Sequence, residues 1–317
     1  MSFNILGTGF YVPEQVITNN DLTEMVDTSD EWITKRVGVK QRHISKNETA
    51  ADFALKASLA ALEASSVKPE ELDLIIAASI TSDSVCPTVA SSVQRDIGAN
   101  CPAFDINSAC SGFLFGLDIA SSYFERDGIK NILVVGAERL SKVIDWKDRS
   151  TCVIFGDGAG AFVLTKGDSL LSSTIYTKGG DSVLSIPNYI GTSPFYEKEA
   201  KKPCLFMEGQ ETFKFAVNRI VEDIKCVTEK AGISIEDIDY VVPHQANIRI
   251  IDYASKRLGI PKEKFFVNIE KYGNTSAASV PIAFAELDKS GKLKKGDIVV
   301  MSAFGGGLSS AACLIRI

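Results

Sequence analysis

Short apolar runs of strand length alternate along the chain with stretches of helical periodicity. The runs "LDLIIAAS" (72–79), "NILVVGAE" (131–138), "IDYVVPHQ" (238–245) and "DIVVMSAF" (297–304) are nearly continuous, as in strands that are covered on both faces. The stretches "FALKASLAALEAS" (53–65) and "FAVNRIVEDIKCVTEKAG" (215–232) place apolar residues every three or four positions. The second stretch ends at Gly232, a residue suited to terminate a helix. This alternation predicts an α/β protein.

The chain resembles itself at a shift of 166 residues. This shift places "PEELDLIIAA" (69–78) on "IEDIDYVVPH" (235–244), "NILVVGA" on "DIVVMSA", and "NSACSG" (107–112) on "GNTSAA" (273–278), so that Cys110 is expected to be equivalent to Ser276. Further on, "GAGAFVL" (158–164) matches "LSSAACLI" (308–315) only if the first half carries about 15 extra residues near 140–155. We therefore expect two similar halves, residues 1–170 and 171–317, connected by the Gly- and Ser-rich stretch 167–203.

Cys110 lies at a predicted turn from a strand to a helix. The preceding "PAFDIN" (102–107) has an extended pattern, and Phe113, Leu114 and Leu117 follow at helical spacing. A helix N-terminus favours a thiolate over a thiol, which predicts a lowered pKa for Cys110. Taken alone, a free cysteine is more often a buried, inert thiol.

Two further polar residues occupy similar junctions. His244 ends the strand pattern "IDYVVPH" (238–244), and Asn274 precedes the helical pattern "TSAASVPIAFAELDKSG" (275–291). Ligands bind at the carboxyl ends of strands in α/β sheets, so we expect Cys110, His244 and Asn274 to converge as a nucleophilic constellation. Taken singly, the histidine suits a local hydrogen bond and the asparagine suits a turn or a helix cap. His43 lacks such a context and is expected to be structural.

Composition and charge narrow the class of protein. The chain has 45% hydrophobic and 23% charged residues and a net charge of −6, which is typical of a globular protein and argues against nucleic-acid binding. It contains no apolar run of about 18 residues, and its N-terminal stretch lacks a secretory signal, so we expect no membrane span. Seven cysteines without CxxC spacing and only two histidines argue against a disulfide framework and a metal site. We expect a cytoplasmic protein.

Two glycine-rich stretches do not match phosphate-binding loops. Both "GDGAG" (156–160) and "FGGGL" (304–308) run into apolar strands rather than into helices. They are better interpreted as tight turns with accessible backbone N–H groups. One of these, from Gly306, is expected to help stabilise an oxyanion.

Several motifs together resemble the β-ketoacyl-acyl-carrier-protein synthase III family of the thiolase superfamily. They are "TSDEWITKRVGVKQRHI", "DINSACSG", "FGDGAGA", "VPHQANIRI", "YGNTSAASVPIA" and "AFGGG", and they span the chain. The resemblance implies a thiolase-like duplicated αβαβα fold of five layers, a homodimer, and no cofactor or metal. It also implies that Cys110 accepts an acyl group, typically acetyl, from coenzyme A. The acyl group then condenses with malonyl-acyl carrier protein, with loss of carbon dioxide.

The resemblance assigns further roles to individual residues. His244 and Asn274 would bind the malonyl thioester oxygen, and the N–H groups of Cys110 and Gly306 would form the oxyanion hole. Coenzyme A would contact Thr28, Trp32, Arg36, Arg149, Asn247 and Phe304. Cys86 would face the acyl pocket, where its small side chain would admit longer or branched primers. The carrier protein would contact Lys214, Gln245, Ala246, Asn247, Ile248, Arg249, Lys256 and Arg257, whose positive charges would steer an acidic partner.

Other interpretations remain open. A thiolase needs a second cysteine ahead of the final glycine-rich turn, and "SAFGGG" (302–307) has none. A paralogue that uses another primer, a cysteine hydrolase and a non-catalytic acyl- or carrier-binding protein are the alternatives. The basic residues alone also suit an ordinary solvated helix face.

Overall fold

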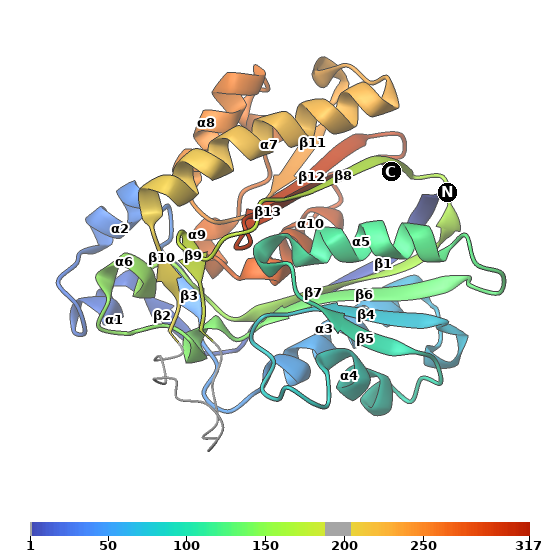
Figure 1. The fold of residues 1–317 in the computed structure, drawn as a ribbon, viewed down its shortest axis with the longest axis horizontal. Coiled ribbons are helices and arrows are strands. Elements are labelled where there is room, and N and C mark those ends of the chain that lie inside the picture. The colour runs from blue at the N-terminus through green and yellow to red at the C-terminus, as the bar shows by residue number, and fades with distance from the viewer. Residues whose placement is uncertain (1, 188–203) are drawn as a thin grey trace.

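The computed structural model of the protein describes residues 2–187 and 204–317, which form five alternating layers of helices and sheets (Figure 1). Two sheets are stacked with one helix pair between them and one helix pair on each outer face. The α/β prediction is therefore confirmed.

The two sheets have the same strand order. The first sheet has the order β1-β7-β6-β4-β5 and the second has the order β8-β13-β12-β11. Where the first sheet has β5, the second has an isolated bridge between Val241 and Phe265. The strands of the first sheet are β1 (Ser2–Tyr11), β4 (Leu74–Ala78), β5 (Ala103–Ile106), β6 (Asn131–Glu138) and β7 (Gly158–Gly167). Those of the second are β8 (Leu170–Thr177), β11 (Tyr240–Pro243), β12 (Ile298–Gly305) and β13 (Ser309–Arg316).

The long helices cover the sheets in matching pairs. Helices α3 (Ala50–Ser65) and α4 (Val89–Ile97) lie outside the first sheet, and α7 (Gly209–Ala231) and α8 (Ile248–Leu258) lie outside the second (Figure 1). Between the sheets lie α5 (Gly112–Tyr123) and α10 (Ser279–Lys289). Gly232 ends α7 in a left-handed conformation, as predicted.

A cluster of aromatic rings fills the central layer. Phe162 of β7 lies 4.9 Å, between ring centroids, from both Phe113 of α5 and Phe284 of α10. The three side chains are buried, and the hydrophobic effect on such large rings is a main source of stability. The helices that follow the cysteine turn and the Asn274 turn are thereby packed on the same ring of β7.

Shorter elements gather near the ends of α7 and β12, on one side of the molecule (Figure 1). The buried Arg42 guanidinium joins them, donating to Asn19 Oδ1 and to the carbonyls of Ile17 and Val153. The elements are β2 (Val16–Thr18), α1 (Asn19–Thr23), α2 (Asp30–Arg36), β3 (Gln41–His43), α6 (Arg149–Cys152), β9 (Leu184–Ser185), β10 (Phe206–Met207) and α9 (Ile269–Tyr272). Within residues 2–187 and 204–317 there are also the 3-10 turns η1 (Pro69–Glu71), η2 (Ala109–Ser111), η3 (Leu140–Lys142), η4 (Ile235–Asp237), η5 (Lys262–Lys264) and η6 (Ser276–Ala278).

The structure corrects the register of the repeat by one residue at the cysteine turn. The turns η2 and η6 begin at Ala109 and Ser276, and these two residues share a left-handed backbone, with φ of 48° and 50°. Ser276 is thus the counterpart of Ala109, and the predicted equivalence of Cys110 with Ser276 is wrong. Sequence comparison matched small side chains there, whereas backbone conformation sets the true correspondence.

The stretch 167–203 is only in part a connection. It contains β8, "LLSSTIYT" (170–177), which pairs along β13 as the edge strand of the second sheet. Residues 188–203 of the expected connection lie outside the described residues. The division into halves 1–170 and 171–317 stays a prediction. Among the described helices, none has the length and apolar character to cross a membrane.

Candidate functional site

The Cys110 turn is held against the second sheet. Cys110 lies in η2, between β5 and α5, and its side chain is 9% exposed. A Cβ atom on Gly305 of β12 would lie 2.7 Å from the backbone nitrogen of Cys110, so only glycine allows this approach. Ser111 Oγ and Ser309 Oγ, 2.7 Å apart, connect the same turn to β13. The Cys110 turn is therefore fixed by the contacts of η2 with β12 and β13.

Burial controls the ionisation of Cys110. Burial raises the pKa of its thiol to about 12, and the negative charge of Glu138 adds to this rise. The Ser276 hydroxyl opposes the rise, because it can donate a hydrogen bond to the thiolate form. The predicted lowering of this pKa by a helix N-terminus is wrong, since desolvation outweighs it. At neutral pH the sulfur is a thiol.

His244 follows β11 and is buried. Its backbone N–H donates to the carbonyl of Ser302 (2.7 Å), and its ring meets the Phe304 ring edge-on at 5.2 Å between centroids. Burial lowers the pKa of His244 to about 3, so the imidazole is neutral at pH 7. A neutral imidazole can donate one hydrogen bond without bringing a charge into the site.

Asn274 is fixed by its backbone and by its side-chain oxygen. Its N–H donates to the carbonyl of Ile154 (2.9 Å), and its carbonyl accepts from the N–H of Gly156 (3.0 Å). Its Oδ1 accepts from the N–H of Ser276 (2.8 Å). With the oxygen engaged, the group that this side chain offers to a ligand is the Nδ2 donor.

One cavity of about 1180 Å³ brings the three residues together. Cys110, His244 and Asn274 all contribute to its wall, and so does Gly306. Pockets for small ligands are usually about 300–1,000 Å³, so this cavity suits a long ligand. The convergence expected from the sequence is thus present in the structure, and the catalytic roles themselves stay predictions.

The residues expected at coenzyme A divide into two groups. Trp32, Arg36, Asn247 and Phe304 line the cavity, whereas Thr28 and Arg149 are not part of its wall. Among the described residues no partner is found for Thr28 Oγ1, although this atom is buried.

Arg149 occupies one face of the Trp32 ring. Its guanidinium carbon lies 5.0 Å from the ring centroid, and its Nη1 donates to the carbonyl of Asp27 (2.7 Å). The Arg36 guanidinium carbon lies 5.6 Å from the same ring. An aromatic ligand therefore enters between Trp32 and Arg149 only if the arginine shifts.

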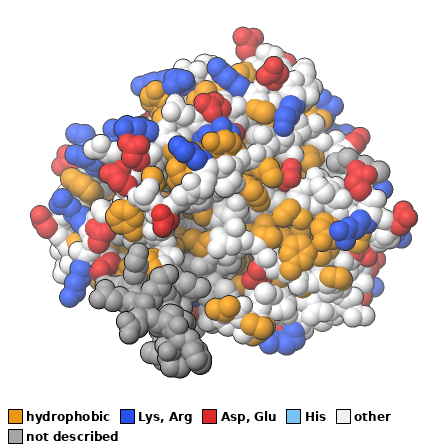
Figure 2. All heavy atoms as spheres, in the orientation of Figure 1, with side chains coloured by type: hydrophobic (Ala, Val, Ile, Leu, Met, Phe, Trp, Pro, Cys, Tyr) orange, Lys and Arg blue, Asp and Glu red, His pale blue; other side chains and the backbone are white. Residues whose placement is uncertain are grey.

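The residues expected to contact a carrier protein fall into an exposed group and a group that lines the cavity or is buried. Lys214, Arg249, Lys256 and Arg257 are exposed on α7 and α8, where lysine and arginine side chains are frequent on the upper surface (Figure 2). Arg249, Ala246 and Asn247 reach the cavity, which places this surface at its mouth.

One residue of this set, Gln245, is buried, and another, Ile248, is half-buried. Gln245 is 1% exposed, and its Nε2 donates to the carbonyls of Pro243 and Phe266. Ile248 packs on Gly38, where an added Cβ would lie 2.7 Å from its own Cβ. We therefore correct the prediction for Gln245, because its side chain is buried and hydrogen-bonds backbone carbonyls of the protein itself. Ile248 is assigned a packing role.

Cys86 lies outside the cavity wall of this chain. Its side chain is exposed, while the neighbouring Ser84 and Val85 line the cavity. The predicted contact of Cys86 with an acyl pocket is therefore not met within one chain, because the segment between β4 and α4 directs it toward the surface.

The sequence did not predict that Glu138, a buried carboxylate, lies at the site. Glu138 ends β6 and is fully buried, accepting from the hydroxyl of Thr81, from the N–H of Ile80 (3.2 Å) and from Ser276 Oγ (3.1 Å). Burial raises its pKa to about 7. An acidic residue that ends the apolar run "NILVVGAE" was the available signal, since a buried acid needs partners. Among the described residues no cluster of side chains suited to a metal ion is found.

Two family models match the chain. The model described as "3-Oxoacyl-[acyl-carrier-protein (ACP)] synthase III" matches residues 104–179, and the model of its C terminal part matches residues 228–317. Among curated relatives, the β-ketoacyl-[acyl-carrier-protein] synthase III of Clostridium acetobutylicum is 49% identical over 320 residues, covering 99% of this chain and 98% of that protein. The synthase III of Aquifex aeolicus is 48% identical and covers 100% of both chains.

Solved structures agree with these relatives. The crystal structure of 3-oxoacyl-[acyl-carrier-protein] synthase III from Aquifex aeolicus superposes with a TM-score of 0.94 over all of both chains, at 48% identity. The synthase III from Thermus thermophilus gives 0.93 at 40% identity over 99% of both. The thiolase-like αβαβα prediction is thereby confirmed. The chain belongs to the β-ketoacyl-[acyl-carrier-protein] synthase III family of acyltransferases.

Proposed function

We propose that this chain is the initiating condensing enzyme of type II fatty acid synthesis. It transfers an acyl group, typically acetyl, from acyl-coenzyme A to Cys110 and then condenses it with malonyl-acyl carrier protein to a 3-ketoacyl product. The observation that carries this proposal is the single cavity lined by Cys110, His244 and Asn274. Residues 1–170 would supply the nucleophile, and residues 171–317 the histidine and asparagine.

In the first step the sulfur of Cys110 attacks the thioester carbonyl. A bond forms between Sγ and the acyl carbon, and the bond from that carbon to the coenzyme A sulfur breaks. The proton of the Cys110 thiol ends on the coenzyme A sulfur, so coenzyme A is released as a thiol. The N–H groups of Cys110 and Gly306 stabilise the oxyanion of the tetrahedral intermediate, and one such donor contributes about 3 kcal/mol in other enzymes. The fixed contact of η2 with Gly305 supports this role, since it holds the nucleophile in place.

In the second step the malonyl thioester loses carbon dioxide. Its thioester oxygen becomes negatively charged as the enolate forms, and two donors, the neutral His244 imidazole and Asn274 Nδ2, stabilise that charge. The enolate carbon attacks the acyl carbon on Cys110, and the sulfur leaves as thiolate. The low pKa of His244 supports this assignment, because a charged imidazolium would bind the malonyl carboxylate and oppose its departure.

The remaining parts of the proposal concern binding and assembly. Trp32, Arg36 and Arg149 bind the nucleotide end of coenzyme A, and Arg249 with Lys256 attracts the acidic carrier protein. Coenzyme A thioester is a substrate, and the steps above use only side chains and backbone of the protein. A cytoplasmic homodimer is part of the same proposal.

Mass spectrometry tests the proposal directly. After incubation with acetyl-coenzyme A, we expect an adduct of about 42 Da on the peptide that contains Cys110, and none in Cys110→Ala. Adding malonyl-acyl carrier protein should remove the adduct and yield ketoacyl-carrier protein. Free acetate in place of that product would indicate a hydrolase, and absence of any adduct would indicate a binding protein.

A further inference from the structure

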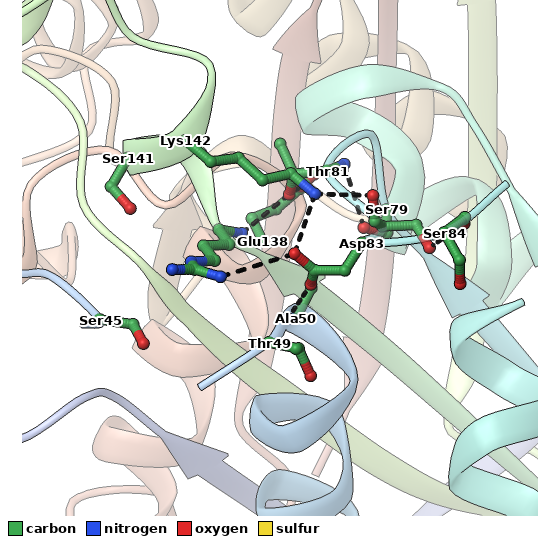
Figure 3. Close-up of polar contacts among 12 residues, drawn as sticks. Ser45, Thr49, Ala50, Ser79, Thr81, Asp83, Ser84, Glu138, Ser141 and Lys142 are labelled. Atoms are coloured by element: carbon green, nitrogen blue, oxygen red, sulfur yellow. Dashed lines mark hydrogen bonds and ion pairs between the residues drawn. The ribbon is translucent and has the colours of Figure 1, made fainter. Parts of the chain in front are cut away.

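Glu138 and Cys110 lie on opposite sides of Ser276. Ser276 lines the same cavity as Cys110, and its hydroxyl donates to Glu138 Oε1 at 3.1 Å. The same hydroxyl lowers the pKa of the Cys110 thiol. Figure 3 shows Glu138 beside Thr81, whose hydroxyl donates to the other carboxylate oxygen. A buried carboxylate is thus connected to the buried thiol by a single hydroxyl group.

The pseudo-symmetry of the fold accounts for this placement. Strands β6 and β12 occupy the same position in the two sheets, and their last residues are Glu138 and Gly305. These two residues are 167 apart, as are Ala109 and Ser276, so the one-residue correction of the repeat applies here too. Gly305 supports the η2 turn of the first half, and Glu138 supports the η6 turn of the second half by accepting from Ser276. The chain therefore carries a carboxylate where its second half carries a glycine.

The charged groups around Glu138 on its outer side are already paired. Asp83 binds Lys142 Nζ (3.2 Å) and Arg139 Nη1 (3.6 Å), and its other oxygen accepts from the N–H of Ala50 (Figure 3). On the β7 side, Asp157 accepts from the backbone N–H groups of Ser45 and Ser141 (both 2.9 Å) and from Ser141 Oγ (2.7 Å). The cavity wall holds Cys110, the neutral His244 and Asp105, whose carboxylate accepts from the N–H groups of Val89 and Ala90 (both 2.8 Å). The remaining charged residues of the wall are Arg36, Asp83, Lys142 and Arg249.

Two buried acids that share one hydroxyl cannot both ionise at low cost. Burial raises the pKa of each, and the Glu138 carboxylate further raises that of the thiol. When two acidic groups interact this strongly, their protons are lost in steps that belong to the pair. A second negative charge in the same desolvated site is much less stable than the first.

We propose that Glu138 and Cys110, bridged by Ser276, form one ionisable pair that carries a single negative charge, with Glu138 as a positioning residue for the nucleophile. Its link to acyl transfer rests on the proposed function. The S–H bond of Cys110 breaks as Ser276 Oγ takes the proton and passes its own proton to Glu138 Oε1. The charge moves from the carboxylate to the sulfur, and no proton is exchanged with solvent.

The pair also closes the proton balance of the first half-reaction. The thiolate forms its bond to the acyl carbon, and coenzyme A leaves as a thiolate. The proton held on Glu138 neutralises that thiolate, and the carboxylate is ionised again. One thiol and one thioester are thereby converted to another thioester and another thiol.

The test is the pH dependence of Cys110 alkylation by iodoacetamide, with the Cys110 peptide quantified by mass spectrometry between pH 5.5 and 9.5. In the parent protein the rate should rise tenfold per pH unit below about pH 7 and level above it, because the pair then holds its one charge. In Glu138→Gln the rates should match the parent at low pH but keep rising. At pH 9 this variant should react at least about tenfold faster than the parent.

Thr81→Val is the second variant, since it removes one donor to the carboxylate without touching Cys110. It should move the levelling to higher pH and raise the plateau rate. Asp157→Asn is the matched control, because it removes another buried carboxylate that does not contact Ser276, and its profile should equal the parent's. The exposed Cys86 is the internal reference, with one rate in all variants.

A loosened site would expose the Cys110 thiol and raise its reactivity at every pH. A gain confined to high pH, with rates that match the parent at low pH, therefore distinguishes the two explanations. The proposal is overturned if Glu138→Gln levels at the same pH as the parent, or if the parent does not level. It is equally overturned if Thr81→Val leaves the profile unchanged. Alkylation needs neither coenzyme A nor carrier protein, so this result is independent of whether the proposed function holds.

Discussion

Replacing Gly305 with alanine tests whether its close approach to Cys110 positions the nucleophile. The added Cβ would lie 2.7 Å from the Cys110 nitrogen and 3.0 Å from its Cβ, whereas ordinary contact begins at 3.4 Å. Backbone atoms of η2 must therefore move by about 0.7 Å. The turn resists this movement because Ser111 and Ser309 hold it.

The expected magnitudes follow from this displacement. A misplacement of 1 Å costs roughly 100-fold in rate, so acylation of Cys110 in Gly305→Ala should slow by about 10- to 100-fold. Overpacking of a buried position costs about 1–3 kcal/mol, which should lower the free energy of unfolding by that amount.

The assay combines single-turnover acetylation, followed by mass spectrometry, with urea unfolding. Gly179→Ala is the control, since an added Cβ there meets nothing within 4 Å, and it should behave as the parent. If Gly305→Ala is acetylated within about threefold of the parent rate, η2 tolerates the shift and the positioning argument is wrong.

Three further predictions concern charge. Burial holds the pKa of His244 at about 3 in the folded protein, below its usual 6.5, so as pH falls this residue takes up a proton in the unfolded state only. Between pH 7 and 4.5 the free energy of unfolding of the parent should therefore fall by about 3 kcal/mol relative to that of His244→Asn, as measured by urea unfolding. Parallel plots of the two free energies against pH would contradict this. Arg149→Ala should raise the KM for acetyl-coenzyme A about fivefold, because the contacts of the Arg149 guanidinium with Trp32 and with coenzyme A are lost. The KM for malonyl-acyl carrier protein should not change, which is the control. Arg249→Glu should raise the KM for malonyl-acyl carrier protein severalfold, and this increase should be smaller at high salt. Lys256→Glu should change the KM in the same direction. An increase that does not depend on salt would indicate misfolding.

The periodic parts of the fold were predictable from the sequence. Continuous apolar runs mark the central strands, and Gly232 marks the end of α7, because burial and helix termination depend on local residue types. The internal repeat also predicted two halves of similar structure, because equivalent strands and helices in each half have to be buried in the same way. The strand β8 was assigned to a connection because its "LLSSTIYT" alternates weakly and is rich in serine and threonine.

The polar surroundings of the site were less predictable. Gln245 lies in a motif that the resemblance assigns to a partner, yet its amide binds backbone carbonyls internally. Glu138 and Thr81 reach Ser276 from distant segments, and only the folded chain brings them together. The sequence predicts a lowered pKa for the Cys110 thiol because of its place at a helix start, which is a local effect. In the folded protein, burial of the thiol by many parts of the chain raises the pKa instead.

A crystal structure of the protein after reaction with acetyl-coenzyme A tests the central claim most directly. We predict an acetyl group on Sγ of Cys110, with its carbonyl oxygen about 2.7–3.1 Å from the N–H groups of Cys110 and Gly306. The His244 ring and Asn274 Nδ2 should face the space beside that acetyl group. An acetyl group on another cysteine, or a carbonyl oxygen turned away from both N–H groups, would contradict the account.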